Sequence, residues 1–449
     1  MPIIDMIFKA GVVGAGGAGF PAHVKLSGKG IKHFILNGAE CEPLLRTDRY
    51  IMRHKAKEIV LAADAVRAEI AAECCTIALK HTYIKEIAAL KDAIESTGAC
   101  IQLHLLDSFY PAGDEQAIVY EVTGQVVPAM GIPLDVGAVV SNVATILAVF
   151  DAMNGKAFTH RYVTVTGLIK NPVILYVPVG TSFEHCISLA GGAIDESYYV
   201  INGGPMMGTP LSIEQLKAAV VTKMTSGIIL IREDSYLATR QQISLAHMKN
   251  RAAAACIQCN FCTQLCPRYL LGHPLEPHRI MRKMAMGSSI TSMLEDPVIQ
   301  SAALCCECGV CETYACPMEL QPRRVNSIIR QELAKAGIRY ELSKREYRAN
   351  ADRKDRKIPT RRIAARAGVL PYYDYEIDEL LEHTPGLVCI PLKQHIGMPS
   401  VPVVRVGELV EAGQLIASCP KDQLGANIHT GIAGIVVNVG ASITIEGRA

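Results

Sequence analysis

The stretch Cys256-Ile-Gln-Cys-Asn-Phe-Cys-Thr-Gln-Leu-Cys-Pro267 carries four cysteines and a proline at the spacing C-x2-C-x2-C-x3-C-P. A second stretch, from Cys305 to Pro317, repeats this spacing with one extra residue before its last cysteine. Such spacing is typical of cysteines that bind [4Fe-4S] clusters, so the sequence predicts two clusters in a helical module. The predicted metal ligands are Cys256, Cys259, Cys262, Cys266, Cys305, Cys308, Cys311 and Cys316. Cys306 would break the even spacing, and we predict that it is not a ligand.

The geometry of an iron-sulfur cube explains this spacing. Three cysteines separated by two residues can wrap a tight turn around one cube, while a fourth stands at the start of a helix. The runs resemble those of two-cluster bacterial ferredoxins, in which the fourth cysteine of each run binds the other cluster. The resemblance therefore implies that Cys266 and Cys316 are exchanged between the clusters. Structural zinc is the alternative, although zinc sites rarely combine three such cysteines with a following Cys-Pro.

The composition predicts a multidomain protein of a reducing compartment. The chain has 449 residues, 50% of them hydrophobic, which allows three or four domains. Its 45 basic and 43 acidic residues nearly balance, so neither nucleic acid nor an anionic membrane is expected as a partner. The longest apolar stretch, residues 136–150, contains polar residues such as Ser141, and we expect no membrane span. Asp5 and Lys9 interrupt any signal-peptide core, and the expected location is cytoplasmic.

Eight further cysteines have no framework spacing. We expect them to be reduced, buried side chains. They are Cys41, Cys74, Cys75, Cys100, Cys186, Cys306, Cys389 and Cys419.

Changes in hydrophobic periodicity and composition along the chain predict an α/β multidomain fold. In the first part, the strand-like residues 31–36 and 100–106 alternate with the helix-like residues 55–70 and 86–94. The predicted units are an α/β domain (1–155), a small β-rich module (156–235), the helical module around the cysteines (241–335), a basic linker (336–384) and an all-β C-terminal module (385–449). The basic stretch within the linker is expected to be solvated chain or the exposed face of a helix.

A glycine-rich segment near the N-terminus indicates a ligand-binding loop. It reads Gly11-Val-Val-Gly-Ala-Gly-Gly-Ala-Gly-Phe-Pro21. Its glycines at positions 14, 16, 17 and 19 would let backbone N–H groups approach a phosphate or a planar ring. No clear strand precedes the segment, so it does not match the dinucleotide-binding G-x-G-x-x-G context, and a structural turn is the alternative.

Three polar segments accompany this loop. Asn37-Gly-Ala-Glu-Cys-Glu-Pro43 follows a predicted strand, so its polar groups would lie at the carboxyl end of that strand, where α/β sheets bind ligands. Tyr110-Pro-Ala-Gly-Asp-Glu-Gln116 is a second acidic loop after a buried strand, and Ser141-Asn-Val-Ala-Thr145 lies inside an apolar run. Each segment alone is better explained as a solvated loop or a helix cap.

Together, in order and spacing, the four segments resemble the flavin- and NADH-binding subunit of respiratory complex I and, more closely, the RnfC-type subunit of Rnf complexes. The resemblance covers about residues 1–335, with a β-grasp-like (SLBB) module before the clusters, and it implies FMN and NADH as cofactors. The residues that it implies for FMN binding are Gly14, Gly16, Gly17, Gly19, Lys25, Asn37, Glu40, Asn142 and Thr145. Those implied to face the flavin and nicotinamide are Phe20, Glu42, Gly113, Asp114 and Glu115, with Glu42 and Glu115 as the catalytic residues that place the nicotinamide. Ala39 occupies the position at which the complex I subunit has an aspartate, so the flavin contact of that aspartate is not implied here.

The position of the C-terminal β module in the chain distinguishes between the related families. The segment Ile390-Pro-Leu-Lys-Gln-His-Ile-Gly397 has its Rnf counterpart at the N-terminus of that subunit, whereas here it stands near the C-terminus. This permuted order is similar to that of the cobalamin reductases of propanediol-utilising bacterial microcompartments. The module also resembles barrel-sandwich hybrid domains that carry biotin, but Lys421 does not match the modified hairpin-tip lysine. We therefore expect a docking or structural module.

The resemblance implies an NADH-dependent cobalamin reductase. NADH gives up two electrons as a hydride, whereas a corrinoid or an iron-sulfur cluster accepts electrons singly. A flavin can accept the hydride and release its electrons one at a time. The implied path runs from NADH through FMN and two [4Fe-4S] clusters to cob(III)alamin or cob(II)alamin, in support of a cobalamin-dependent diol dehydratase. An adenosyltransferase and microcompartment shell proteins are candidate partners, and the implied location is inside a microcompartment.

Two alternatives remain at this stage. One is an Rnf-C-like NADH:ferredoxin electron-transfer subunit, which the permuted C-terminal module disfavours. The other is a non-catalytic iron-sulfur docking scaffold, which the intact glycine loop and its acidic partners argue against. No motif identifies a corrinoid site: His81, His160 and His395 could bind cobalt, but an isolated histidine is more often structural.

Overall fold

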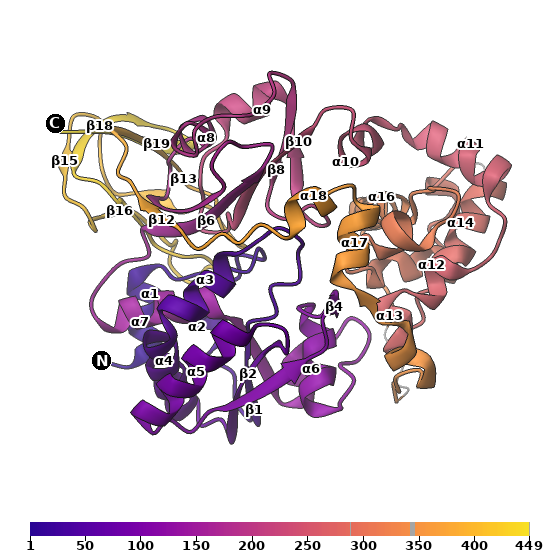
Figure 1. The fold of residues 1–449 in the computed structure, drawn as a ribbon, viewed down its shortest axis with the longest axis horizontal. Coiled ribbons are helices and arrows are strands. Elements are labelled where there is room, and N and C mark those ends of the chain that lie inside the picture. Colours follow the sequence, from indigo (N-terminus) through magenta and orange to yellow (C-terminus); the bar gives the residue numbers. More distant parts are fainter. Residues whose placement is uncertain (288, 342–345, 449) are drawn as a thin grey trace.

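The computed structural model of the protein describes residues 1–287, 289–341 and 346–448. Its first domain, indigo to purple in Figure 1, is built on a parallel sheet with the strand order β3-β2-β1-β5. The strands are β1 (His33–Asn37), β2 (Cys74–Lys80), β3 (Gln102–Leu106) and β5 (Ala138–Asn142). Because the strands are parallel, their carboxyl ends meet at one edge of the sheet.

Helices cover both faces of this sheet. The larger hydrophobic core lies on one face, and α6 (Glu115–Thr123) covers the other. Phe34 and Leu36 of β1 enter the larger core and Ile35 enters the smaller one, as alternation along a strand requires. The helices of the larger core are α1 (Ile3–Ala10), α4 (Ala56–Glu69), α5 (Ile84–Thr97) and α7 (Val143–Met153). The α/β prediction for this domain is confirmed.

The second module is a mixed six-stranded sheet in the order β12-β7-β6-β10-β8-β9. The helix α8 (Phe183–Leu189) packs on it through Phe183 and Ile187, and the Ser182 hydroxyl caps this helix by accepting a hydrogen bond from the His185 N–H. The strands are β6 (His160–Gly167), β7 (Val173–Pro178), β8 (Tyr198–Asn202), β9 (Thr209–Leu211), β10 (Gly227–Arg232) and β12 (Leu380–Glu382).

Short helices surround both cysteine runs in the third module, on the right of Figure 1. Four of them begin at a proline, whose fixed φ suits the first helical position. Their packing leaves a core rich in Met, Leu and Ile. The main helices are α11 (Leu245–Ala255), α12 (Phe261–Gln264), α13 (Pro267–Leu270), α14 (Pro277–Met286) and α16 (Pro322–Lys335).

The basic segment after this module is partly buried where the structure describes it: Arg353 is buried, whereas Arg361 and Arg366 are exposed. Arg353 is only 8% exposed and pairs with Glu121 of the first domain. The strand β11 (Ile358–Pro359) pairs with β4 (Phe109–Tyr110), and α17 (Thr360–Arg366) and α18 (Leu370–Tyr373) follow. We call residues 346–384 the strap. The charge run did not predict that Arg353 and Lys357 share Glu121, which lies more than two hundred positions earlier in the chain.

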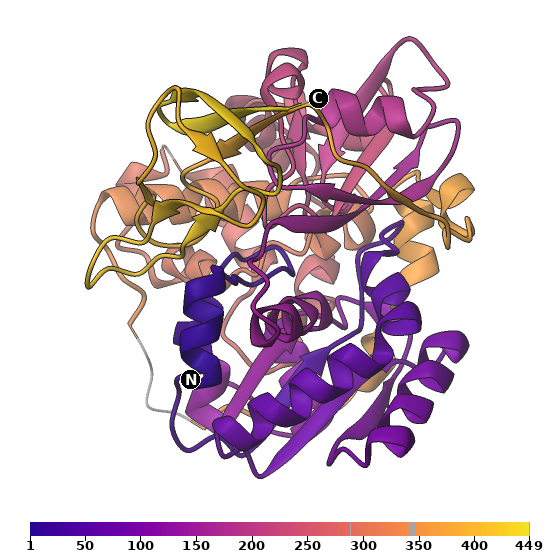
Figure 2. The ribbon, with the colours of Figure 1, turned by 90° about the vertical axis from the view of Figure 1, so that its left-hand side faces the viewer.

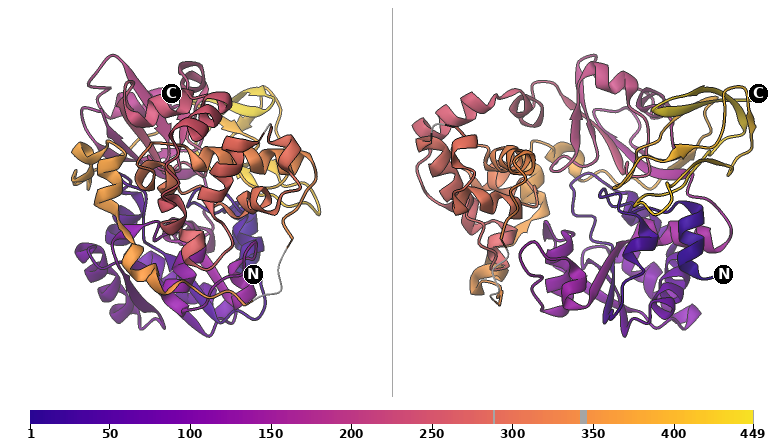
Figure 3. Two further views of the ribbon diagram at one scale, coloured as in Figure 1. Left: turned by 90° about the vertical axis from the view of Figure 1, so that its right-hand side faces the viewer. Right: turned by 180° about the vertical axis from the view of Figure 1, so that it is seen from behind.

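The C-terminal module consists of two small antiparallel sheets, with the orders β13-β19-β18-β15 and β14-β16-β17. It stands directly beside α1, as Figures 2 and 3 show from three sides. The Asn427 side-chain amide donates to the Phe8 carbonyl at 3.3 Å. The strands are β13 (Leu387–Pro391), β14 (Val401–Pro402), β15 (Leu409–Val410), β16 (Leu415–Ser418), β17 (Ile428–His429), β18 (Gly434–Val439) and β19 (Ser442–Gly447).

Two further expectations concern the surface of the molecule. Within the described ranges, no helix has both the length and the apolar character that crossing a membrane requires. The cysteines outside the two runs differ in burial: Cys75 and Cys186 are buried, whereas Cys100 is exposed. The expectation that all of them are buried is therefore wrong.

Candidate functional site

The glycine loop folds back on itself near the N-terminus. The Gly14 N–H donates to the Phe20 carbonyl at 2.8 Å, and the Gly19 N–H donates to the Gly14 carbonyl at 3.2 Å. Gly17 and Gly19 have φ values of +104° and +65°, which favour glycine. A Cβ on Gly19 would lie 2.3 Å from Met224 Sδ, whereas one on Gly17 would meet no atom within 4 Å. The loop thus has a tightly packed base and an open crest, which fits a cradle for the phosphate or ring of FMN.

Helix α7 supports the loop. The Thr145 hydroxyl accepts a hydrogen bond from the Ala15 N–H at 2.9 Å. Asn142 caps α7 by accepting from the Ala144 N–H at 2.8 Å, and a Cβ on Gly16 would lie 3.2 Å from the Asn142 Cβ. The structure therefore brings together the glycine loop and the Ser141–Thr145 segment, which are far apart in the sequence.

The ends of β1 and β5 add two further predicted segments. Asn37 and Asn142 are direct partners in the parallel pairing of these strands. The Asn37 side-chain amide donates to the Gly113 carbonyl at 2.9 Å and so fixes the loop that precedes α6. These groups meet at the carboxyl edge of the sheet, where open α/β sheets bind ligands.

Lys25 and Glu115 form an ion pair at the rim of this site. The Lys25 Nζ and the Glu115 Oε1 are 2.5 Å apart, and the side chains are 35% and 43% exposed. Lys25 ends the short helix α2 (Ala22–Lys25), and Glu115 is the first residue of α6. A partly exposed pair contributes only about 0–1 kcal/mol to stability, so an incoming ligand can replace it readily.

Glu40 is buried and caps the helix α3 (Thr47–His54). Its carboxylate accepts hydrogen bonds from the N–H groups of Asp48 at 2.7 Å and Arg49 at 3.3 Å. Burial raises the pKa of Glu40, and burial together with the Glu40 charge raises the pKa of Asp48 to about 7. Asp48 also accepts a hydrogen bond from the Asn142 amide at 2.6 Å. The prediction of the site missed Asp48, whose one signal was its position shortly after Pro43.

Glu42 contacts the second module. Its carboxylate accepts hydrogen bonds from the N–H groups of Met206 and Met207, each at 2.9 Å, and its Oε1 lies 3.3 Å from the Tyr110 hydroxyl oxygen. A Cβ on Gly204 would lie 2.2 Å from the Glu42 Oε2, so only glycine allows this approach. Burial raises the pKa of Glu42 to about 7, a value at which a carboxyl group can exchange a proton at neutral pH. Its role beside the nicotinamide stays a prediction.

Two side chains of the loop before α6 contact the cysteine module. The Asp114 carboxylate accepts two hydrogen bonds from Arg268, at 2.6 and 2.9 Å, and also caps α6 through the Ala117 N–H. The Tyr110 hydroxyl donates to the Cys308 carbonyl at 2.8 Å. That Asp114 faces the flavin and nicotinamide stays a prediction. Arg268 was not among the predicted site residues, because no local signal in the sequence connects it to Asp114.

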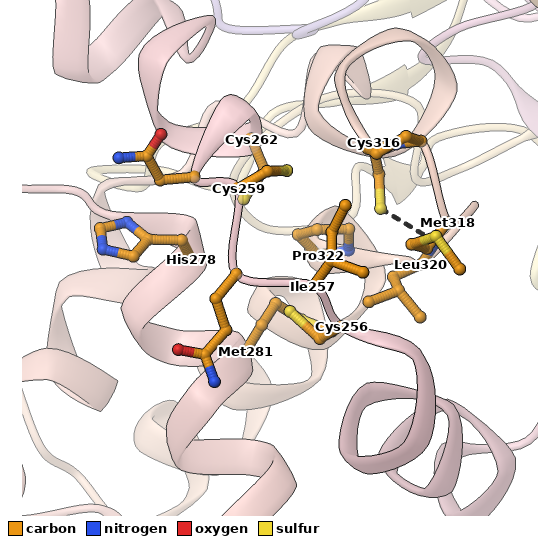
Figure 4. Close-up of a pocket in the computed structure, with 13 residues that line it drawn as sticks. Cys256, Ile257, Cys259, Cys262, His278, Met281, Cys316, Met318, Leu320 and Pro322 are labelled. Carbon is orange, nitrogen blue, oxygen red and sulfur yellow. Dashed lines mark hydrogen bonds between the residues drawn. The ribbon is translucent and has the colours of Figure 1, made fainter.

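The cysteines form two groups that cross the two runs. Cys256, Cys259, Cys262 and Cys316 line one pocket, shown in Figure 4. There the Leu320 N–H donates to the Cys316 Sγ at 3.3 Å. Burial, followed by the charge of Cys316, raises the pKa of Cys262 to about 12. Four thiols around one space are a donor set that fits a [4Fe-4S] cluster.

Cys266 lies with the second run. Burial and then the nearby Cys306 thiol raise the pKa of Cys266. Burial raises the pKa of Cys311, with smaller contributions from Glu312, Cys305 and Cys266. This grouping is the one implied by the resemblance to two-cluster ferredoxins, and the ligand assignment stays a prediction. Among the described residues, no three His, Cys, Asp or Glu side chains converge closely enough for a single metal ion.

The C-terminal module completes the base of the glycine loop. The Ile396 N–H donates to the Gly19 carbonyl at 3.0 Å. Lys223, only 1% exposed, donates from its Nζ to the carbonyls of Gly11 at 2.6 Å and Asn427 at 2.7 Å. Burial lowers the pKa of Lys223 to about 7. Contacts rather than chain order therefore fix the place of this module, so a permuted sequence can put it beside the loop.

Four family models match successive parts of the chain. They are the Nuo51 FMN-binding domain (residues 7–151), the SLBB domain (162–210), the 4Fe-4S dicluster domain (255–321) and the RnfC barrel sandwich hybrid domain (375–448). Their order confirms the predicted fold class: an FMN-binding α/β domain, an SLBB module, a dicluster module and a barrel-sandwich module.

Curated relatives match the chain over different lengths. The chain is 38% identical to the cobalamin reductase PduS of Salmonella typhimurium, over 97% of this chain and 94% of that protein. It is 37% identical to PduS of Citrobacter freundii, again over 97% and 94%. The RnfC-type component of the proton-translocating ferredoxin:NAD(+) oxidoreductase complex of Clostridium ljungdahlii is 35% identical, but over 60% of this chain and 56% of that component. The chain therefore belongs to the PduS family of cobalamin reductases.

Proposed function

We propose that this chain oxidises NADH and reduces cobalamin through FMN and two [4Fe-4S] clusters. The observation that carries the proposal is the direct contact between the two halves of such a relay. The loop that lies against Asn37 at the carboxyl edge of the sheet also supplies the Tyr110 hydroxyl that donates to the Cys308 carbonyl at 2.8 Å. One short segment thus connects the candidate flavin site with a predicted cluster ligand.

The residues around the glycine loop suit the binding of FMN, which when bound converts a hydride into single electrons. In our proposal the open crest at Gly17 receives the cofactor, while Lys25, Asn37, Asn142 and Thr145 supply polar contacts. The remaining members of the proposed set are Gly14, Gly16, Gly19, Phe20 and Glu40.

Two carboxylates are proposed to place the nicotinamide. Glu115 stands at the rim, where its pair with Lys25 is partly exposed and can open for an amide or a ribose hydroxyl. Glu42 is fixed by two backbone N–H groups, and its raised pKa of about 7 lets it hold a proton near neutral pH. Gly113 and Asp114 shape the loop between them and, through Arg268, hold it against the cysteine module.

We further propose that electrons enter the cysteine module at the second run and leave at the first. The second run contacts the first domain through Cys308, whereas residues between the ligands of the first run are exposed: Ile257 is 61% exposed and Phe261 is 49% exposed. The proposed ligand sets are Cys305, Cys308, Cys311 and Cys266 at the entry and Cys256, Cys259, Cys262 and Cys316 at the exit.

Anaerobic reconstitution tests the proposal. The chain reconstituted with FMN, iron and sulfide should show flavin absorbance that NADH bleaches, followed by reduction of cob(III)alamin or cob(II)alamin. Ferredoxin in place of cobalamin provides the comparison with an Rnf-type activity. Reduced flavin and clusters that reduce no corrinoid would exclude cobalamin reduction, and a chain that binds no FMN would support a scaffold instead.

The partners and the location are proposed from the family alone. The names of the relatives concern cobalamin, and we propose that this chain works inside a propanediol-utilisation microcompartment, next to an adenosyltransferase and shell proteins. Purified microcompartments of the source cells should contain the chain in protease-protected form. A chain found wholly outside the purified shells would contradict the proposed location.

A further inference from the structure

Apart from the cysteine pocket, a polar cavity lies beside the candidate flavin site, over the carboxyl end of β2. Its volume is about 240 Å³. Its walls come from α3, the segment after β2 and the strap, and residues 373–377 of the strap lie along one side. The lining includes Glu40 and Glu42 but no residue of the glycine loop, so the 37–43 segment separates the two sites. The functions proposed above use Glu40 and Glu42 but place no ligand in this cavity.

Lys80 is the most deeply buried cation in the wall. It is 2% exposed, and burial lowers its pKa to about 8. Its Nζ has two hydrogen-bond acceptors, the Glu40 carbonyl and the Thr360 hydroxyl, each at 3.4 Å. Both distances are at the long end for a hydrogen bond, so this ammonium group is incompletely satisfied. Burying such a group is unfavourable unless another partner completes its shell.

Arg49 and Arg46 add donors to the same wall. The Arg49 Nε donates to Glu86, and its guanidinium group lies over the Tyr83 ring at 4.5 Å. In the ranges that the structure describes, the two terminal nitrogens of Arg49 have no hydrogen-bond partner in the chain. Arg46 donates to the carbonyls of Leu45 and Tyr373, which ties the strap to the cavity.

The carboxylates of the wall are already engaged elsewhere. Glu40 accepts from the backbone of α3, and Glu42 accepts from the second module. Asp374 pairs with Arg361, and Glu376, 85% exposed, lies 3.7 Å from Lys85. The groups left available to a ligand are therefore mainly cationic, and they lie beside aromatic rings.

We propose that this cavity binds a phosphate group, either as inorganic phosphate or as a small phosphomonoester. Two arginines and a buried lysine can complete their hydrogen bonds on the oxygens of one dianion. The volume admits a phosphate group with a small organic part but not a corrinoid or a dinucleotide. The ligand would join the strap to the segment that carries Glu40 and Glu42.

Calorimetric titration of the FMN-loaded holoprotein with inorganic phosphate and, separately, with glycerol phosphate tests this site. FMN loading keeps the glycine loop occupied. Saturable binding is expected, weakened about 10-fold or more in Lys80→Met and in Arg49→Gln, since each removes a charge-assisted contact. Tighter binding of glycerol phosphate would identify a phosphomonoester, and equal binding would identify free phosphate. Arg232, whose partner in an exposed ion pair is Asp234, does not line the cavity, so Arg232→Gln is the control and should bind as the parent does.

The flavin content and NADH bleaching of each variant separate this proposal from the function proposed above. A variant that keeps its flavin is folded, so weaker phosphate binding then reports on the cavity itself. Absence of saturable phosphate binding to the flavin-loaded parent overturns the site, as does binding that Lys80→Met and Arg49→Gln leave unchanged. A chain that binds phosphate here but does not reduce cobalamin would refute only the proposed function.

Discussion

The cysteine runs and the glycine loop are held in opposite ways. Within each run, three predicted ligands lie close together in the sequence, and one pocket gathers the first three cysteines of the first run with Cys316. The glycine loop is held from three distant parts of the chain, by the side chains of Thr145 and Lys223 and by the backbone N–H of Ile396. The comparison teaches that a metal-binding module can be specified locally, whereas a backbone cradle depends on the packing of the whole molecule.

The largest effect is expected from removing Cys316, the cysteine of the second run that is predicted to bind the cluster of the first run. Cys316→Ser should lower the iron content to about half and abolish reduction of the acceptor, since one of two clusters loses a ligand. Iron analysis and electron paramagnetic resonance of the reduced protein measure the effect. Cys306→Ser is the control and should keep both cluster signals. Two unchanged signals in Cys316→Ser would show that Cys316 is not a ligand.

The glycine loop can be broken by a single methyl group. Gly19→Ala must adopt a φ of +65° and place its Cβ 2.3 Å from Met224 Sδ, so FMN affinity should fall about 10- to 100-fold. Fluorescence titration of the apoprotein with FMN measures it. Gly192→Ala has a similar positive φ of +81° and no atom within 4 Å of its Cβ, so it controls for backbone strain alone. Equal FMN affinity in both variants would contradict the packed base of the loop.

Breaking the contact between the first domain and the cysteine module should have a smaller effect, confined to electron transfer between them. Asp114→Asn removes the charge that Arg268 binds at 2.6 and 2.9 Å. We expect NADH-dependent reduction of the clusters to slow about 10-fold while FMN remains bound, because the loop loses its hold on the cysteine module. Stopped-flow absorbance follows the flavin and the clusters separately. Asp234→Asn, in an exposed pair with Arg232, should leave the rate unchanged; an unchanged rate in Asp114→Asn would show that the pair does not position the two modules.

The smallest expected effect is a pH dependence at the base of the loop. Burial lowers the pKa of Lys223 from 10.5 to about 7, so the unfolded state binds more protons between these values. The contribution of Lys223 to the free energy of unfolding therefore rises with pH from about 7 to 10.5 and is constant below that window. FMN release during urea unfolding, measured from about pH 7 to about pH 10, should show a shallower rise in Lys223→Met than in the parent. The exposed Lys217→Met is the control, and parallel curves for all three proteins would contradict the predicted role of Lys223.

The sequence indicated much of the fold because its signals are local. The predicted helix 55–70 is observed as α4 (Ala56–Glu69), and the predicted strand 31–36 is observed as β1 (His33–Asn37). The contact of the strap with the first domain was not predicted, because a run of basic residues shows charge but not the acidic partner that binds Arg353. Glu42 was chosen from its motif, whereas its partners Met206 and Met207 have no signature that connects them to it.

The sequence by itself determined the positions of the two cysteine runs, the glycine loop and the order of the modules, because cysteine spacing, absent side chains and periodicity are properties of short segments. Only the tertiary structure decided that Arg268 holds Asp114 and that the C-terminal module contacts the base of the glycine loop through Ile396. These contacts join segments far apart in the chain. Their free energy comes from burial and hydrogen bonding that exist only once the modules have packed together.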